Sequence, residues 1–363
     1  MAHIPTLGSR WRQRSLAVAA MAPLVALALT ATNGTGAVAA ASSTPFKVCM
    51  GTGGQGINWE TGQGVVLQSL AQKEGWSSVV LSNNNSASTA LSNVEVFIQD
   101  HCNAVVEFNP APSANAVMAA KLAAAKIPAI TYDIGQPGWY FVGIDNLKAG
   151  IAGGQMLGKI IKSKWNCDPD LIIASNAAGA GVVNTERTGG MITGVLDECP
   201  GIAKAKIVNF EGGGQTSVSL PAARAVLAAH PSASKIAVVG INDSGVVGGL
   251  EAAEQLGRAS NLIGWGQDGS LVTGPNVDPH LAGSVFYFLE GYPEATLPLL
   301  KEIAAGHAPA VRDNTHNNPA VSLQPCPVTA AQAHKVPDYS ARLKAMQKAA
   351  PGTTEYALFC PNK

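Results

Sequence analysis

The chain has 363 residues, of which 47% are hydrophobic and 13% are charged, with 24 basic and 24 acidic side chains and a formal net charge of zero. This composition is typical of a folded chain with more than one domain, and the lack of net positive charge argues against nucleic acid or an anionic membrane surface as a partner. The 39 glycines and 22 prolines indicate many turns between regular elements.

The first 41 residues have the pattern of a secretory signal. Three arginines precede an apolar run over residues 16–30, and a tail of small residues offers cleavage sites near Ala40 or Ala41. The run is short for a transmembrane helix and has the length of a signal core. We therefore predict a cleaved signal and an exported protein, periplasmic or extracellular, with an uncleaved anchor as the alternative.

Strand-like and helix-like segments alternate from residue 46 onward. The predicted strands of the first half cover residues 46–50, 77–82, 103–108, 127–133 and 140–146, and the helical patterns cover residues 65–74, 89–100 and 114–125. Strands separated by helices predict βαβ units and a parallel sheet.

The loop after the first strand reads Gly-Thr-Gly-Gly-Gln-Gly over residues 51–56, which has the G-x-G-x-x-G spacing of a dinucleotide-binding turn. Such a turn needs a helix that begins inside the glycines and an acidic residue at the end of the next strand. The helical pattern begins only after Trp59, and the next strand leads into asparagines at 83–85. We predict instead a glycine-rich lip that lets Gln55, Asn58 and Trp59 reach into a ligand site.

The alternation of strands and helices starts again in the second half. Predicted strands cover residues 170–175, 206–210, 235–240, 261–265, 283–288 and 320–325, and a helix covers residues 295–305. Two successive sets of βα units predict two similar lobes, and in such sheets ligands bind at the carboxyl ends of the strands.

The six cysteines after the signal segment are even in number, which in an exported chain predicts disulfides. Proximity in sequence favours Cys167 with Cys199 and Cys326 with Cys360, which leaves Cys49 with Cys102, although the sequence leaves other pairings open. No pair has C-x-x-C spacing and no histidine stands at ligand spacing, so we predict neither a metal nor a cofactor.

Polar and aromatic side chains gather just after the predicted strands. They are Asn109, Asp133, Asp145, Asn146, Asn242, Asp268 and Tyr287, together with Arg187 near the start of a helix and Trp139 beside a Pro-Gly turn. Amides and carboxylates suit the hydroxyls of a neutral polyol, a guanidinium can hold two adjacent oxygens, and aromatic faces cover the C–H side of a sugar ring. A helix cap would also explain Asn242, a turn would explain Asp133, and packing would explain Trp139.

Seven segments occur in the order found in the type 1 periplasmic sugar-binding proteins, closest to the ribose-binding group that serves ABC importers. They are FNP (108–110), IPAITYD (127–133), VGIDN (142–146), ERTGG (186–190), AAHP (228–231), GINDSGVVGGLEAAEQLG (240–257) and IGWGQDG (263–269). The chain resembles this family from Pro45 to Pro325.

The resemblance implies an α/β fold of two Rossmann-like lobes with parallel sheets, joined by three hinge crossings that close on a sugar. It implies ligand contacts from Asn109, Asp133, Arg187, Asn242 and Asp268, with Trp59 near a stacking position. The hinges are expected at Asp145 and Asn146, at Tyr287 and at residues 318–322.

The chain departs from the ribose-binding pattern at four positions. Ile134 stands where ribose binders have a second arginine, and Gln267 is inserted before Asp268. Tyr287 replaces a glutamine, and Gly214 falls near a stacking phenylalanine. We therefore do not expect ribose bound in the same pose.

The predicted segments are a signal over residues 1–41, a first lobe over 42–145 plus 288–318, a second lobe over 146–287 plus 319–330, and a C-terminal extension over 331–363. We predict a monomeric binding protein for a small sugar or polyol that has no enzymatic activity and delivers its ligand to an ABC permease. The alternatives are a sensor component for a chemoreceptor or kinase, and a sugar-processing hydrolase that uses Asp133 and Asp268.

Overall fold

The computed structural model describes residues 45–54, 58–109, 112–273, 276–312 and 321–361. The predicted signal segment and Gln55 lie outside these ranges. None of the helices within them combines the length and the apolar character needed to cross a bilayer.

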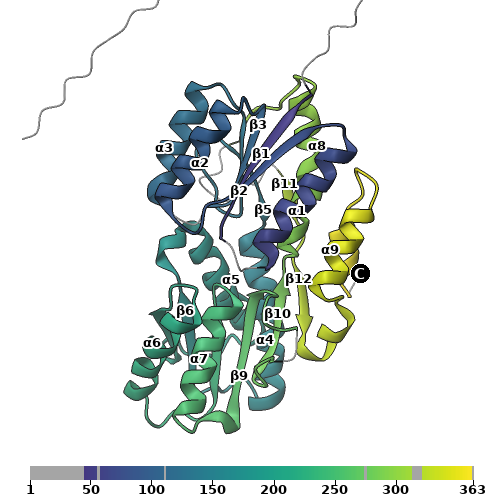
Figure 1. Cartoon of the computed structure of the whole chain (residues 1–363). Coiled ribbons are helices and arrows are strands. Elements are labelled where there is room, and N and C mark those ends of the chain that lie inside the picture. Colours follow the sequence, from purple (N-terminus) through teal and green to yellow (C-terminus); the bar gives the residue numbers. More distant parts are fainter. Residues whose placement is uncertain (1–44, 55–57, 110–111, 274–275, 313–320, 362–363) are drawn as a thin grey trace, which may run out of the picture. The chain divides into compact units, whose positions relative to one another are not determined.

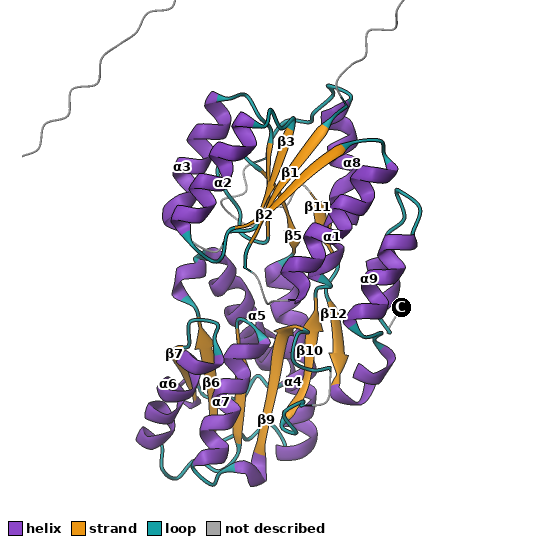
Figure 2. Ribbon diagram, in the orientation of Figure 1, coloured by secondary structure: helices purple, strands orange, loops and turns teal. Residues whose placement is uncertain are grey.

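Six parallel strands form the first sheet in the order β2-β1-β3-β4-β5-β11 (Figures 1 and 2). The strands are β1 (Lys47–Thr52), β2 (Ser77–Ser82), β3 (Ala104–Glu107), β4 (Ala129–Tyr132), β5 (Tyr140–Ile144) and β11 (Val321–Leu323). The helices of this first lobe are α1 (Asn58–Lys73), α2 (Ala87–Gln99), α3 (Pro112–Ala124) and α8 (Tyr292–Ala304). Strands β3, β4 and β5 are buried throughout, as expected where helices cover a parallel sheet.

The second sheet repeats this arrangement in the order β7-β6-β8-β9-β10-β12. Its strands are β6 (Leu171–Asn176), β7 (Ile207–Glu211), β8 (Ile236–Gly240), β9 (Leu262–Asp268), β10 (Leu281–Phe286) and β12 (Cys326–Thr329), of which β12 alone runs antiparallel to its neighbour, β10. The helices of this second lobe are α4 (Asn146–Trp165), α5 (Val182–Glu198), α6 (Thr216–Ala229) and α7 (Asp243–Gln255). The prediction of two lobes with similar sheets is confirmed.

All the predicted strands are present, with ends that shift by a few residues, whereas α1 begins earlier than predicted. The helix starts at Asn58, so Trp59 lies in its first turn. Apolar periodicity becomes visible only at Val65, because the first two turns are polar and contain Gly62 and Gly64. The start of α1 was therefore hidden from a prediction based on hydrophobic spacing.

The chain crosses between the sheets three times. The first crossing joins β5 to α4 at Asp145, whose carboxylate accepts a hydrogen bond from the backbone N–H of Lys148 and caps α4. The second crossing runs from β10 through a short 3-10 helix, η4 (Leu289–Gly291), into α8, and the third lies between β11 and β12.

The third crossing differs from its predicted position. Strand β11 pairs in parallel with β5 and so belongs to the first sheet, whereas residues 319–330 were predicted for the second lobe. The change of lobe therefore occurs between Leu323 and Cys326. A three-residue apolar strand fits either sheet, and only its pairing decides between them.

All six cysteines form disulfides, and the predicted pairs Cys49–Cys102, Cys167–Cys199 and Cys326–Cys360 are confirmed. The first lies within the first lobe and the second within the second lobe. The third ties β12 to the end of the C-terminal extension, which contains η5 (Ala330–Lys335), α9 (Tyr339–Lys348) and η6 (Glu355–Phe359).

Candidate ligand-binding site

Aspartates stand at the carboxyl ends of strands in both sheets. Asp133 directly follows β4, and Asp268 is the last residue of β9. Their φ angles are 62° and 90°, in the left-handed region that few residues other than glycine adopt. Such constrained backbone positions gather at ligand sites, where the fold has to hold a side chain in one place.

Arg187 on α5 connects the two lobes at the centre of the molecule. Its guanidinium donates to a carboxylate oxygen of Asp133 at 2.9 Å and to the side-chain oxygen of Asn146 at 2.6 Å. The other oxygen of Asp133 accepts the hydroxyl of Tyr292 at 2.9 Å. Arg187 and Asp133 are 6% and 7% exposed, so this is a buried ion pair between the lobes.

Close packing of glycines brings α5 to this position. A Cβ added to Gly154 on α4 would collide with the backbone carbonyl of Met191 on α5. The two helix backbones therefore lie in direct contact. This approach allows Arg187 to reach Asn146 at the start of α4.

Tyr287 fills the space beneath the guanidinium. Its ring centroid lies 4.6 Å from the central carbon of Arg187, a cation–π contact, and its hydroxyl donates to the side-chain oxygen of Gln267. Burial raises the pKa of Tyr287, so the hydroxyl stays protonated and can donate. The ring of Tyr287 therefore packs against one face of the Arg187 guanidinium.

A second pair of carboxylates lies beside this network. Asp243, fully buried, accepts the hydroxyl of Ser284 at 2.6 Å and the backbone N–H of Leu271 at 2.9 Å. Burial and then the charge of Asp268 raise the pKa of Asp243 well above its usual value. Burial likewise raises the pKa of Asp268 to about 6, against the lowering effect of its hydrogen bonds from Ser270. A protonated carboxyl can donate as well as accept, which suits a hydroxyl-rich ligand.

Asn242 caps α7, as the helix-cap alternative predicted. Its side-chain oxygen accepts the N–H of Gly245 at 2.9 Å, and its amide nitrogen donates to the carbonyl of Gly214 at 2.9 Å. These bonds fix the orientation of the amide. Asn242 and Asp268 both line a cavity at the carboxyl edge of the second sheet.

Two cavities flank the central network. The larger, of about 1000 Å³, lies between residues 214–216, 242–244 and 268–273 of the second lobe and residues 330–342 of the extension. The smaller, of about 540 Å³, is lined by residues 115–119 and 134–141 of the first lobe and 179–183 of the second.

One backbone N–H of the glycine-rich loop is already bonded within the protein. The backbone N–H of Gly54 donates to a carboxylate oxygen of Glu60 in the first turn of α1. A carboxylate therefore lies where a nucleotide-binding turn would place an anion. Burial raises the pKa of Glu60 to about 7, with the bond from Gly54 lowering it. Of the residues predicted for the glycine-rich lip, Asn58 and Trp59 begin α1. The structure does not describe their side chains.

The first lobe places two other predicted residues in buried positions. Asn109 is 3% exposed and donates to the side-chain oxygen of Asn115 at 2.7 Å. Trp139 is 2% exposed and packs in the apolar cluster formed by α2, α3 and the strands they cover. The packing alternative therefore accounts for Trp139, and we do not carry it into the proposed site.

A buried carboxyl group beside the glycine-rich loop, that of Glu107, was missed in the sequence analysis. Glu107 ends β3, is 1% exposed and accepts the side-chain amide of Asn83 at 2.8 Å. Burial raises the pKa of Glu107 to about 8, while the bond from Asn83 lowers it. The sequence did contain a sign of this group, because Glu107 is a charged residue within the apolar run of residues 103–108. Among the described residues, no cluster of histidine, cysteine, aspartate and glutamate could hold a metal ion.

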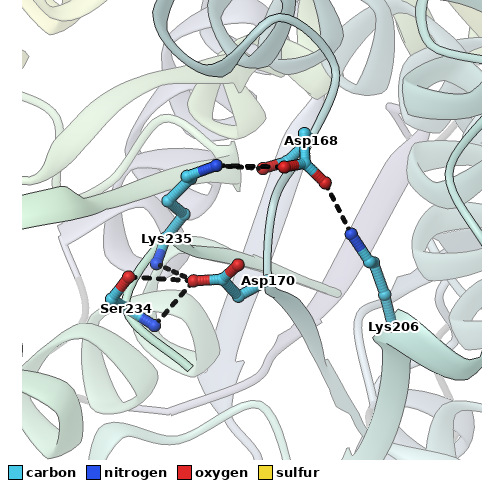
Figure 3. A network of polar contacts seen from close by, with 5 residues as sticks. All are labelled: Asp168, Asp170, Lys206, Ser234 and Lys235. Atoms are coloured by element: carbon cyan, nitrogen blue, oxygen red, sulfur yellow. Dashed lines mark hydrogen bonds and ion pairs between the residues drawn. The ribbon is translucent and has the colours of Figure 1, made fainter. Parts of the chain in front are cut away.

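A network of charged side chains occupies the opposite, amino edge of the second sheet (Figure 3). Lys206 and Lys235 donate to Asp168 at 2.7 and 3.1 Å, and Asp170 accepts from the backbone and the hydroxyl of Ser234 at 2.9 Å. The hydrogen bonds from the two lysines lower the pKa of Asp168. Because these residues precede β6, β7 and β8, they lie away from the carboxyl edge where ligands of such sheets bind.

Comparison with solved structures supports the fold. An ABC transporter solute-binding protein from Actinobacillus succinogenes with bound D-allose is 16% identical, with a TM-score of 0.63 over 80% of this chain and 99% of that one. One from Bacillus halodurans with bound myo-inositol is 17% identical, with a TM-score of 0.64 over 81% and 98% of the two chains. The fructose-binding periplasmic domain of a hybrid two-component system is 17% identical, with a TM-score of 0.64 over 84% and 97%.

No curated protein matches the sequence. A family model described as periplasmic binding protein domain matches residues 49–306, which is most of the chain. Together with the two parallel-sheet lobes and their three crossings, this match shows that the chain belongs to the periplasmic binding protein domain family and has its type 1 fold.

Proposed function

We propose that this protein captures a small neutral sugar or polyol between its two lobes and delivers it to an ABC permease. The observation that carries the proposal is the convergence of Asp133, Arg187, Asn242 and Asp268 at the facing carboxyl edges of the two sheets. Carboxyl, amide and guanidinium groups there offer both donors and acceptors, which hydroxyl groups require. The bound sugars and polyols of the structural neighbours agree with this chemistry.

The crossings support binding by hinge closure. Cys49–Cys102 and Cys167–Cys199 each stiffen one lobe, and neither of these disulfides joins one lobe to the other. Rotation about these crossings would part Arg187 from Asp133 and open the site. The two lobes would act as rigid bodies and the crossings as hinges, with Asp145 and Asn146 at the first of them.

The three disulfides and the family of the chain both agree with export from the cytosol. Three disulfides persist in an oxidising compartment and not in the cytosol. We propose that residues 1–41 direct the chain to the periplasm or the cell exterior, and that the folded protein acts there as a monomer.

A ligand screen tests the proposal. Thermal shift over pentoses, hexoses, inositols and disaccharides, followed by calorimetry, should identify a solute that raises the melting temperature. Asp268→Asn should weaken its binding about 10- to 100-fold, since hydrogen bonds to charged groups contribute about 1.5–3 kcal/mol. Asp168→Asn, at the amino edge, is the matched control and should bind as the unmodified protein does. If none of these solutes binds, or if both variants behave alike, the proposed site is incorrect.

One structural neighbour favours a second role. The fructose-binding domain of a hybrid two-component system has the same fold, so the liganded protein could equally signal to a kinase. The two roles predict different partners for the closed form. Pull-down with membranes from the native host should recover permease subunits in the first case and a sensor kinase in the second. Incubation with the bound sugar, analysed for products, tests the hydrolase alternative.

A further inference from the structure

The described part of the C-terminal extension folds back onto the second lobe. It leaves β12 through η5, continues through α9 and returns to β12 through the Cys326–Cys360 disulfide. The carboxylate of Asp338 caps α9 by accepting the backbone N–H of Ala341 at 2.8 Å. In Figure 1 this yellow segment lies beside α1 and β12.

Polar contacts fix the extension to the first lobe. The ammonium group of Lys73 at the end of α1 donates to the backbone carbonyls of Gln347 and Ala349, both at 2.6 Å. The backbone N–H of Tyr356 donates to the carboxylate of Glu294 on α8 at 3.0 Å. These contacts place α9 against the first lobe, although the extension is covalently joined to the second.

A buried ion pair holds the middle of the extension. Arg342 on α9 donates to a carboxylate oxygen of Glu290 at 2.5 Å, and the two side chains are 11% and 2% exposed. The guanidinium also lies 5.6 Å from the ring centroid of Phe288. Arg342 is therefore neutralised, and it carries no free positive charge into the neighbouring cavity.

The extension forms one side of the larger cavity. Residues 330–342 line it opposite Asn242 and Asp268. The hydroxyl of Tyr339 lies against α1 of the first lobe, because a Cβ added to Gly62 would lie 2.5 Å from its oxygen. Tyr339 also lines the cavity together with residues of the second lobe. A volume of about 1000 Å³ is at the upper end of the usual range for small-molecule pockets, so a solute can extend from Asp268 towards the extension.

We propose that the extension is the third wall of the ligand site and that Tyr339 contacts the bound sugar or polyol. This inference rests on the proposed function. The half-buried ring offers an apolar face to the C–H side of a sugar, and its hydroxyl offers one donor and one acceptor. Burial, followed by the charge of Glu290, raises the pKa of Tyr339, which keeps this donor protonated at neutral pH.

Calorimetry on the full-length oxidised protein tests the inference, with D-allose, myo-inositol, maltose and trehalose as probes. Tyr339→Ala should raise Kd at least tenfold, and Tyr339→Phe should raise it by about three- to tenfold through loss of one hydrogen bond. Lys344→Ala, on the exposed side of α9, is the matched control and should leave Kd unchanged.

The results distinguish direct contact between Tyr339 and the solute from a purely structural role of Tyr339. If Tyr339 contacts the solute, its two variants should change the order of affinities among the probes, whereas a supporting role would weaken all of them equally. Unchanged binding by Tyr339→Phe and Tyr339→Ala, or a uniform loss, would overturn the inference and leave the proposed function intact. If the unmodified protein binds none of the probes, the proposed function and this inference both fail. Should Tyr339→Ala not fold, Tyr339→Phe decides.

Discussion

The Asp133–Arg187 pair provides the sharpest test of the ligand-free state. Arg187→Met keeps most of the side-chain length but leaves the Asp133 carboxylate buried without the guanidinium, while the hydroxyl of Tyr292 still donates to it. The two side chains of the pair are only 10% and 8% exposed. Removing one partner of a buried ion pair costs about 3–5 kcal/mol of the free energy of unfolding, because the other charge is left uncompensated.

Urea unfolding of the ligand-free protein measures this cost. Lys206→Met is the matched control, because it removes an exposed, solvent-screened ion pair with Asp168 and should leave the free energy of unfolding almost unchanged. Adding Asp133→Asn to Arg187→Met should restore part of the lost stability, with a coupling energy of about 1–3 kcal/mol.

A loss of stability in Arg187→Met no greater than that in Lys206→Met would contradict this prediction. That result would mean that the pair is not formed without ligand, and that the lobes of the free protein are apart. If the expected cost is found, ligand binding has to take place in competition with an existing contact between the lobes.

Two further predictions concern stability. Because the pKa of Glu107 is about 8 in the folded state against an ordinary 4.5, the folded protein retains a proton that the unfolded chain releases. The free energy of unfolding should therefore decrease as the pH rises from about 4.5 to 8. Glu107→Gln should flatten this decrease in pH-dependent urea unfolding, and parallel profiles would exclude Glu107 as its source. Replacing Cys326 and Cys360 by serine should cost about 4 kcal/mol by loop entropy, given a sequence separation of 34, and an unchanged calorimetric transition would contradict this.

Local patterns were sufficient to predict most of the fold. Apolar strands bounded by turns located every strand of the first sheet, and the restart of the pattern after residue 170 revealed the second lobe. Strand β12 was missed because Cys326–Thr329 is short and contains Pro327, which is tolerated at a sheet edge. Helix α9 was not predicted because its sequence has no strong apolar stripe. Its position is evident only from its packing against α1.

The positions of the candidate residues were more predictable than their contacts. Asp133 and Asp268 lie at strand ends as predicted, at the carboxyl edges of the two sheets. Their partners were not predictable, since Tyr292 meets Asp133 from 159 residues away. The contribution of the extension to the cavity was also invisible, because no local pattern records which distant surface a helix covers.

The last strand of each sheet comes from the same short stretch near the C-terminus. Strand β11 closes the first sheet beside β5, and β12 closes the second beside β10. The first sheet therefore cannot be completed before Leu323 is synthesised, nor the second before Thr329, and pairing over such separations is slow. A chain cut before Val321 would leave β5 and β10 as unprotected edges, each a template for aggregation with another copy.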